Sequence, residues 1–386
     1  MRAADVLERR VRTRLAELEA GGLLRSLRPP AGIDLSSNDY LGLSAHPLLK
    51  QRMMEAVMRE GCGSTGSRLL RGERDGFAAV ERAFARFKGV ERSLYFSSGY
   101  MANLAVLATF GEPGDVVYSD ERNHASLIDG CRLSRARRVV FPHNDVDALA
   151  RLLQQETDPG QKFVVTESLF SMDGDMAPLA AYAALCRSSG AALIVDEAHA
   201  VGIYGERGSG LIEAARIDKD VFVSINTAGK ALGVSGGFVA GPEWAGDYLV
   251  QRARPFIFST APPPPVADAL VASFALLASE PKRRERLRQR ARYLRELLAS
   301  AGVAVPAGES QIIPIVIGDN SAAVAVAAAL QRAGFDVRAV RPPSVPPGTA
   351  RLRLSVNVSL SEETLDRFVA LLATTLREYA PCCAAF

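Results

Sequence analysis

A chain of 386 residues is too long for one ordinary hydrophobic core and long enough for two domains. Hydrophobic residues make up 48% of it and charged residues 23%, which is typical of a folded globular protein and excludes a disordered or fibrous one. The formal net charge of +3 is too small to argue for binding to nucleic acid or to an anionic membrane surface, so we expect neither partner.

The sequence also gives no sign of a targeting segment, a membrane span or a metal site. The first residues lack the apolar core of a signal peptide, and no apolar run reaches the roughly 20 residues needed to cross a bilayer. The cysteines are odd in number and none forms a C-x-x-C pair, so neither a disulfide framework nor a metal site is predicted; they are Cys62, Cys131, Cys186, Cys382 and Cys383. Reduced thiols are typical of the cytosol, and we expect a cytoplasmic protein.

The first predicted elements are helical. Residues 5–28 predict one arginine-rich helix that ends at Pro29-Pro30. A polar loop follows, then a helix over 47–60. From about 77 to 255, strand and helix patterns alternate, with strands expected over 93–97, 115–118, 138–141, 162–166, 193–196 and 220–227. This alternation predicts an α/β domain with a mostly parallel sheet covered by helices on both faces.

A run of four prolines at 262–265 interrupts the pattern. Beyond it we expect a long helical region over 266–301 and a compact α+β unit, with strands over 312–317, 335–340 and 350–356 and helices over 321–333 and 361–378. The expected domains are therefore an N-terminal helix and arm over 1–45, a large domain over 46–260, and a linking helix with a small C-terminal α+β domain over 261–386.

Four residues with useful chemistry follow two neighbouring strands of the predicted sheet. Asp196-Glu-Ala-His199 comes after one apolar run, and Thr227-Ala-Gly-Lys230 ends the next. Ligands of parallel sheets bind beyond the carboxyl ends of the strands, so we expect all four side chains to face one crevice. An amine that anchors a ring covalently and an acid that pairs with a ring nitrogen suit pyridoxal phosphate (PLP).

Two other motifs give competing interpretations. Asp196-Glu-Ala-His199 also looks like the metal-binding box of a helicase-type NTPase, but the phosphate loop that this requires has no match before it. Gly61-Cys-Gly-Ser-Thr-Gly66 spells a dinucleotide fingerprint, yet it follows a helical pattern where a strand is needed.

The single residues also have ordinary structural explanations. Asp196 could cap a helix, and Lys230 could be a solvent-facing loop lysine. His124 and His199 could be loop histidines, and Ser98-Gly99 could form a plain strand–helix turn instead of a phosphate cradle.

Taken together, the motifs resemble the α-oxoamine synthase family of fold-type I PLP enzymes over essentially the whole chain. The matching segments are 37–42, 63–68, 98–99, 124–126, 167–174, 196–199 and 227–230. The resemblance implies a fold-type I PLP-dependent transferase, with a large domain around a mostly parallel sheet and a smaller α+β C-terminal domain. It also implies that the chain is a homodimer.

The resemblance implies roles for particular residues. The catalytic residues would be Lys230 as covalent anchor and base, Asp196 at the pyridine nitrogen, His124 on the ring face and His199 at the ring oxygen. The cofactor contacts would be Gly99, Tyr100, Ser171, Asp196, His199, Thr227 and Lys230, with Thr260 reaching the neighbouring subunit's phosphate. The substrate contacts would be Arg25, Asn38, His124, Ser344 and Arg353.

Three segments look most like the members of the family that use L-alanine: 143–145, 318–321 and 341–353. They imply a decarboxylative condensation of L-alanine with pimeloyl-CoA or a pimeloyl carrier-protein thioester, a step of biotin synthesis. Condensation of glycine with acetyl-CoA, use of another acyl thioester, and a cofactor-free binding relative remain alternatives. Arg71 stands near the expected substrate entrance, where the family usually has a small serine.

Overall fold

The computed structural model describes residues 3–380, and these divide into two compact units. The larger unit contains 38–171 and 175–286; the smaller contains the described residues up to 37, a short insert at 172–174, and the chain from 287 on. These boundaries differ from the expected ranges of 1–45, 46–260 and 261–386. The difference arises because α11 (Pro265–Ser279) packs on α2 (Pro47–Glu60) and α3 (Asp75–Lys88) of the larger unit.

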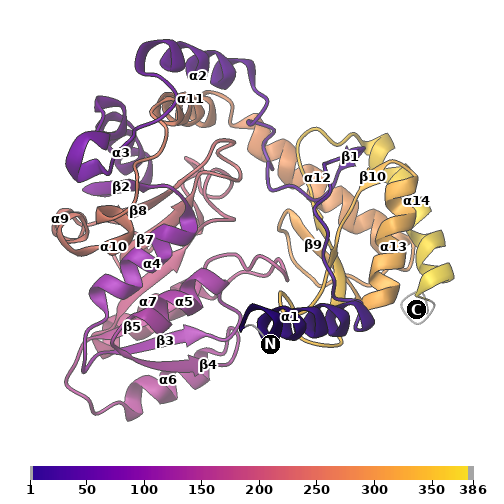
Figure 1. Cartoon of the computed structure of the whole chain (residues 1–386), viewed down its shortest axis with the longest axis horizontal. Helices are drawn as coiled ribbons and strands as arrows, with labels where there is room; N and C mark the ends of the chain where they lie inside the picture. Colours follow the sequence, from indigo (N-terminus) through magenta and orange to yellow (C-terminus); the bar gives the residue numbers. More distant parts are fainter. Residues whose placement is uncertain (1–2, 381–386) are drawn as a thin grey trace. The chain divides into compact units, whose positions relative to one another are not determined.

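The larger unit is built on a seven-stranded sheet in the order β2-β8-β7-β6-β5-β3-β4 (Figure 1). The strands are β2 (Arg92–Phe96), β3 (Val116–Asp120), β4 (Arg137–Phe141), β5 (Lys162–Glu167), β6 (Ala192–Asp196), β7 (Val221–Thr227) and β8 (Gly237–Gly241). Strands β3 to β7 pair in parallel, whereas β8 is antiparallel to both its neighbours. The predicted α/β fold with a mostly parallel sheet is confirmed.

Successive strand residues point to opposite faces of the sheet. Because the strand residues on both faces are apolar, helices cover both faces. Val165 and Ile194 belong to one buried cluster, which includes residues of α4 (Gly99–Phe110), α5 (Ala125–Leu133), α9 (Glu243–Arg252) and α10 (Arg254–Ile257). Val164 and Val195 belong to the other, with α6 (Val146–Gln155), α7 (Leu179–Ser189) and α8 (Leu211–Ala215). Strands buried on both faces explain the continuous apolar runs in the sequence.

The smaller unit has the expected α+β character. An antiparallel sheet in the order β11-β12-β9 and a parallel pair β1-β10 form its strands, with β1 (Ile33–Asp34), β9 (Ile312–Gly318), β10 (Phe335–Asp336), β11 (Ala339–Val340) and β12 (Ala350–Ser355). Its main helices are α1 (Ala3–Ala20), α13 (Asn320–Arg332) and α14 (Glu362–Tyr379), and α12 (Lys282–Ser300) enters it from residue 287 on.

Three predicted elements differ from the structure, one in its extent and two in their continuity. The first helix ends at Ala20 and not at residue 28, because Gly21-Gly22 follows and Gly22 adopts a φ of 63°. The helical region expected over 266–301 is present as two helices, α11 and α12, which are divided around Pro281, a residue with no backbone N–H to donate. The strand expected over 335–340 is two short strands, of which β10 pairs with β1 and β11 with β12.

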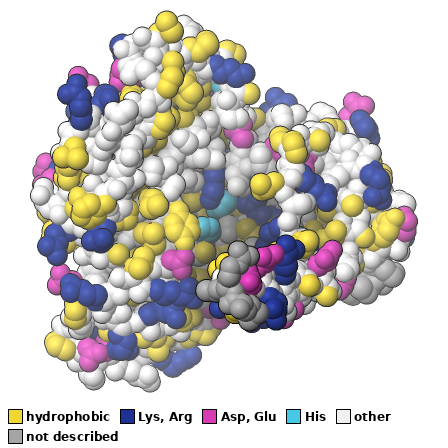
Figure 2. Space-filling model, in the orientation of Figure 1, with side chains coloured by type: hydrophobic (Ala, Val, Ile, Leu, Met, Phe, Trp, Pro, Cys, Tyr) yellow, Lys and Arg dark blue, Asp and Glu magenta, His cyan; other side chains and the backbone are white. Residues whose placement is uncertain are grey.

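On the face shown in Figure 2, side chains of both charge signs are interspersed, in keeping with the small net charge. Across residues 3–380, none of the helices is both long and apolar enough to cross a membrane. Cys62, Cys131 and Cys186 are free thiols, whereas Cys382 and Cys383 lie outside the described residues.

Candidate active site

A cavity of about 230 Å³ opens beyond the carboxyl ends of β5, β6 and β7, entirely within the larger unit. Its lining includes every residue predicted at the sheet edge and several predicted elsewhere: Gly99, Tyr100, His124, Asp196, His199, Thr227 and Lys230. The parallel sheet therefore gathers side chains from five segments of the chain at one edge, as the sequence pattern predicted.

The carboxylate of Asp196 is buried at the end of β6, with 5% of the residue exposed. Its Oδ2 accepts a hydrogen bond from Asn103 Nδ2 at 2.7 Å, and its Oδ1 accepts one from the backbone N–H of Ala198 at 2.8 Å. Each oxygen thus has one donor, and a carboxylate oxygen has room for a second. A charged acid held in this way is suited to a protonated ring nitrogen.

The same network positions His124. Asn103 Nδ2 also donates to the hydroxyl of Ser126 at 2.8 Å, and that hydroxyl lies 2.7 Å from His124 Nδ1. His124 is the N-cap of α5, because its ring nitrogen accepts from the Ser126 backbone N–H. The ring of His124 stays accessible in the cavity and meets the Tyr100 ring edge-on at 6.3 Å. Two contacts therefore fix one side of an imidazole whose ring faces the cavity.

His199 joins the amine to a tyrosine. Its Nε2 lies 2.7 Å from Lys230 Nζ, and its Nδ1 lies 2.7 Å from the hydroxyl of Tyr40. Tyr40 is fully buried, and its hydroxyl donates to Asn38 Oδ1 at 2.9 Å. This chain of contacts sets the ring orientation of His199 and holds the lysine amine in the cavity, and it brings Asn38 near the site through Tyr40.

The N-terminus of α4 forms another wall. Ser98 caps the helix by accepting from the backbone N–H of Met101 at 3.2 Å. A Cβ at Gly99 would lie 3.2 Å from Thr227 Oγ1, so only glycine leaves this corner open. The first N–H groups of a helix have no partner within the helix, and together with the Thr227 hydroxyl they suit a phosphate.

Glu167 is an unexpected acid in the cavity wall. It ends β5 directly beside Asp196 in the sheet register, is 3% exposed, and its Oε1 is buried with no hydrogen-bond partner. Burial, and after it the negative charge of Asp196, raise the pKa of the Glu167 carboxyl to about 8, although Lys230 opposes the shift. The raised pKa favours the protonated form of Glu167 beside Asp196 at neutral pH.

The remaining predicted residues lie elsewhere. Ser171 and Thr260 belong to the larger unit but do not line the cavity. Arg25, Ser344 and Arg353 belong to the smaller unit. There Arg25 donates to the backbone carbonyl of Pro342 at 3.0 Å, the Ser344 backbone N–H donates to the Arg341 carbonyl at 3.1 Å, and Arg353 donates to the Ser355 hydroxyl at 2.7 Å.

Sequence reasoning missed three residues of the site, namely Tyr40, Asn103 and Glu167. Asn103 had a signal, because it is an amide side chain in the middle of a mostly apolar helix. Tyr40 and Glu167 lay within the motifs that carried the resemblance, but nothing local to either residue indicated its partner.

The family described as Aminotransferase class I and II matches residues 30–372. An 8-amino-7-oxononanoate synthase of Geobacter sulfurreducens is 43% identical over 96% of this chain and 99% of its own, and one of Anaeromyxobacter dehalogenans is 45% identical over 95% of each. A serine palmitoyltransferase variant from S. paucimobilis, solved with PLP joined to myriocin, superposes with a TM-score of 0.89 at 30% identity, covering 96% of this chain and 97% of its own.

The chain belongs to the aminotransferase class I and II family. Within it, these relatives identify an α-oxoamine synthase of fold-type I, and the cofactor of this family is PLP. The cavity fits that cofactor. It offers a lysine amine, a buried carboxylate with an open acceptor position, and a glycine-opened helix N-terminus beside a hydroxyl.

Glu167→Gln tests the protonation of the buried acid. Between pH 4.5, the ordinary pKa of Glu, and about pH 8, the folded protein holds a proton that the unfolded chain has released. The stability of the cofactor-free protein therefore falls as pH rises through this range, by about 1.4 kcal/mol per unit of pKa difference.

Glu167→Gln should remove this fall. Urea unfolding at pH 5 and pH 8 should show the variant gaining stability relative to the wild type at pH 8 only. Equal differences at both pH values would mean that Glu167 is ionised in the fold.

Proposed function

We propose that this chain condenses L-alanine with pimeloyl-CoA, or with the corresponding carrier-protein thioester, to 8-amino-7-oxononanoate, free thiol and carbon dioxide in biotin biosynthesis. The observation that carries the proposal is the cavity in which Asp196, His199 and Lys230 meet, with 2.7 Å between Lys230 Nζ and His199 Nε2. The substrates follow from 8-amino-7-oxononanoate synthases that are 43–45% identical over nearly the whole chain.

When bound, PLP withdraws electrons from the α-carbon of an attached amino acid, so that bonds to this carbon can break. Asp196 would hold the ring nitrogen protonated through a charge-assisted hydrogen bond, an interaction typically worth about 1.5–3 kcal/mol. Asn103 and the Ala198 N–H keep the acid in place without neutralising it.

Lys230 would anchor the cofactor and then accept the α-proton of L-alanine on Nζ. His199 lies against that nitrogen and orients it, while Tyr40 holds the far side of the His199 ring. The imidazole of His124 would cover one face of the ring. Gly99 and Tyr100, at the start of α4, and Thr227 would bind the phosphate.

The substrate carboxylate would bind Arg353 of the smaller unit. Arg353 and Arg351 are both buried on β12, but Arg351 already forms an ion pair with Asp173 at 2.5 Å and donates to the Met172 carbonyl. Its guanidinium is thereby engaged by a carboxylate, and the choice of Arg353 comes from the resemblance of the segment over 341–353 to the family. Arg25 and Ser344, which lie in the same unit, would also contact substrate.

A condensation with another amino acid and a longer acyl thioester is the second candidate. The S. paucimobilis serine palmitoyltransferase favours it, with a TM-score of 0.89. Its identity of 30% lies well below the 43–45% of the synthases, so it ranks second.

Product analysis separates the two candidates. The purified enzyme with PLP is incubated with alanine, glycine or serine and with pimeloyl-, acetyl- or palmitoyl-CoA, and the products are identified by mass spectrometry. The alanine and pimeloyl-CoA pair should give the dominant product with a mass matching 8-amino-7-oxononanoate. A dominant serine and palmitoyl product would overturn the proposal.

Arg353→Lys tests the carboxylate contact. Lysine keeps the charge but loses the planar fork that grips a carboxylate through two bonds. We expect the KM for alanine to rise and kcat to fall, for a combined loss of roughly 2–5 kcal/mol in transition-state binding, with little change in PLP affinity.

Arg351→Lys is the matched control, because Arg351 lies two residues before Arg353 and therefore on the same face of β12. It should weaken the Asp173 pair and therefore stability, but leave the KM for alanine near the wild-type value. The assignment fails if the kinetic defect follows Arg351 instead.

We further propose a cytoplasmic homodimer with shared active sites. Thr260 is exposed and does not line its own cavity, which leaves it available to a neighbouring subunit. Phe258, two residues earlier, is 71% exposed, and the guanidinium carbon of Arg254 lies 5.0 Å from its ring centre. An exposed aromatic ring with a cation on it is typical of an interface.

Mixed subunits test the shared site. Lys230→Ala and Thr260→Val chains, each impaired alone, should regain activity when unfolded together and refolded, because some heterodimers then contain one intact site. The recovered activity should approach a quarter of that of wild-type chains treated alike. No recovery, or full activity in a species that sediments as a monomer, would contradict the shared site.

A further inference from the structure

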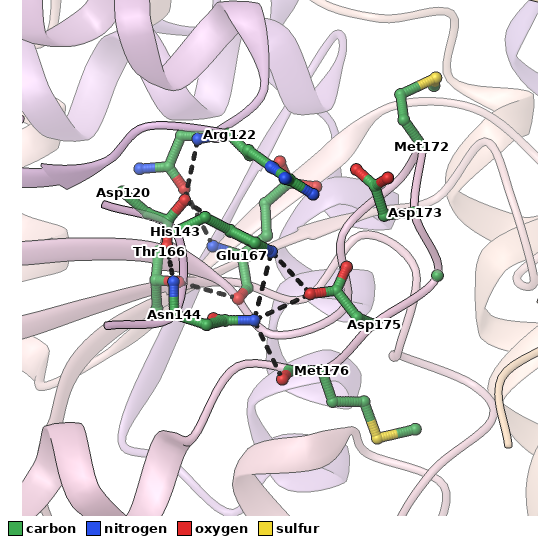
Figure 3. A network of polar contacts seen from close by, with 12 residues as sticks. Asp120, Arg122, His143, Asn144, Thr166, Glu167, Met172, Asp173, Asp175 and Met176 are labelled. Carbon is green, nitrogen blue, oxygen red and sulfur yellow. Dashed lines mark hydrogen bonds and ion pairs between the residues drawn. The ribbon is translucent and has the colours of Figure 1, made fainter. Parts of the chain in front are cut away.

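His143 lies between two carboxylates outside the cavity described above. Its Nδ1 is 2.9 Å from Asp120 Oδ1 and its Nε2 is 2.6 Å from Asp175 Oδ2. Figure 3 shows His143 among the polar residues that surround it. The His143 side chain is 11% exposed, the Asp120 side chain is fully buried, and the edge of His143 packs on Phe170 with ring centres 4.4 Å apart. With an acid at both ring nitrogens, the imidazole is arranged to carry two protons.

One of the two acids organises the turn that delivers His124. Asp120 ends β3, and its carboxylate also accepts from the backbone N–H groups of Arg122 at 2.8 Å and Asn144 at 2.9 Å. Its backbone carbonyl accepts from the N–H of Asn123, the residue before His124. The orientation of the Asp120 side chain therefore fixes the turn over 121–124.

The other acid belongs to the loop after β5. The carbonyl of Asp175 accepts from the Phe170 N–H at 2.9 Å, and the Ala177 N–H donates to the Ser168 carbonyl at 3.1 Å. Asn144 adds a second bond to the Asp175 carboxylate, at 2.8 Å. These bonds fold the loop on itself at the end of the strand that carries Glu167.

The charges around His143 balance only if its ring is protonated. Asp120 and Asp175 contribute two negative charges, and Arg122 contributes a positive charge that acts on Asp175. Burial disfavours the imidazolium, but the hydrogen bonds to Asp120 and Asp175 outweigh burial and raise the pKa of His143 to about 9. A neutral side chain in its place would leave two acids facing one another without the intervening charge.

We propose that the imidazolium of His143 is a positioning residue for the cofactor site, which pins residues 168–171 and 175–177 to the turn over 121–124 so that Glu167 and His124 keep their places in the cavity wall. The proposal rests on the proposed function only in assuming that the cavity binds PLP. It explains why the 143–145 segment belongs with the family motifs although it lies outside the cavity.

The experiment distinguishes a role for the positive charge of His143 from a role in which its side chain only fills space. His143→Gln keeps a donor but loses the charge, and it should weaken PLP binding by the apoenzyme, measured by equilibrium dialysis, roughly five- to thirtyfold. The double variant His143→Gln/Asp175→Asn removes the repulsion and should recover to within about threefold of the wild type. His46→Gln, which alters the half-buried cap of α2, is the matched histidine control and should not change PLP binding.

Thermal stability of the apoenzyme against pH gives a second readout. A pKa raised from 6.5 to about 9 means that the contribution of His143 is complete below pH 6.5 and is lost as pH rises through 9. The wild-type Tm should therefore fall more than that of the double variant between pH 7.5 and pH 10, and titration of Glu167, common to both proteins, cancels in the difference.

The double variant distinguishes a positioning role of His143 from a space-filling one. Rescue by the second substitution, together with loss of the pH step, supports the positioning role. A double variant that binds PLP as weakly as His143→Gln, or that does not fold, would overturn it, because a space-filling residue predicts additive damage. These readouts do not involve turnover, so they stand even if the proposed reaction is wrong.

Discussion

The carboxylate of Asp196 is the constraint on which the site depends. It is buried at the end of a central strand and would be costly to leave without partners, so neighbouring elements must supply donors. The Asn103 amide is the side-chain donor, and by also holding Ser126 it ties α4 and the start of α5 to the sheet edge. The position of His124 follows from the same bonds.

A second chain of contacts places the amine. Tyr40, His199 and Lys230 follow one another with separations of 2.7 Å, and the tyrosine is fully buried. Two residues before His199, Glu197 forms a buried pair with Lys88 at 2.5 Å and also accepts from the backbone of α8. The loop that contains His199 is therefore fixed by two interactions, the Lys88–Glu197 ion pair and the contact between the Tyr40 hydroxyl and His199.

The sequence predicted the sheet edge well because strand endings are local features: an apolar run followed by an acid or a lysine marks the carboxyl end of a buried strand. Partners such as Tyr40, which meets His199 across 159 positions of sequence, depend on long-range packing that no local pattern reports. The prediction of where the first helix ends was wrong for a different reason. Gly21-Gly22 outweighed the charge pattern that favoured a helix to residue 28.

Borohydride reduction tests the central claim that Lys230 anchors PLP. The reduced holoenzyme is digested and its peptides are mapped by mass spectrometry. The chain has only six lysines, so the modified position is unambiguous, and Lys88, buried against Glu197, serves as an internal control. The account predicts the added pyridoxyl phosphate mass on Lys230 and an unmodified Lys88. Modification of any other lysine in its place would contradict it.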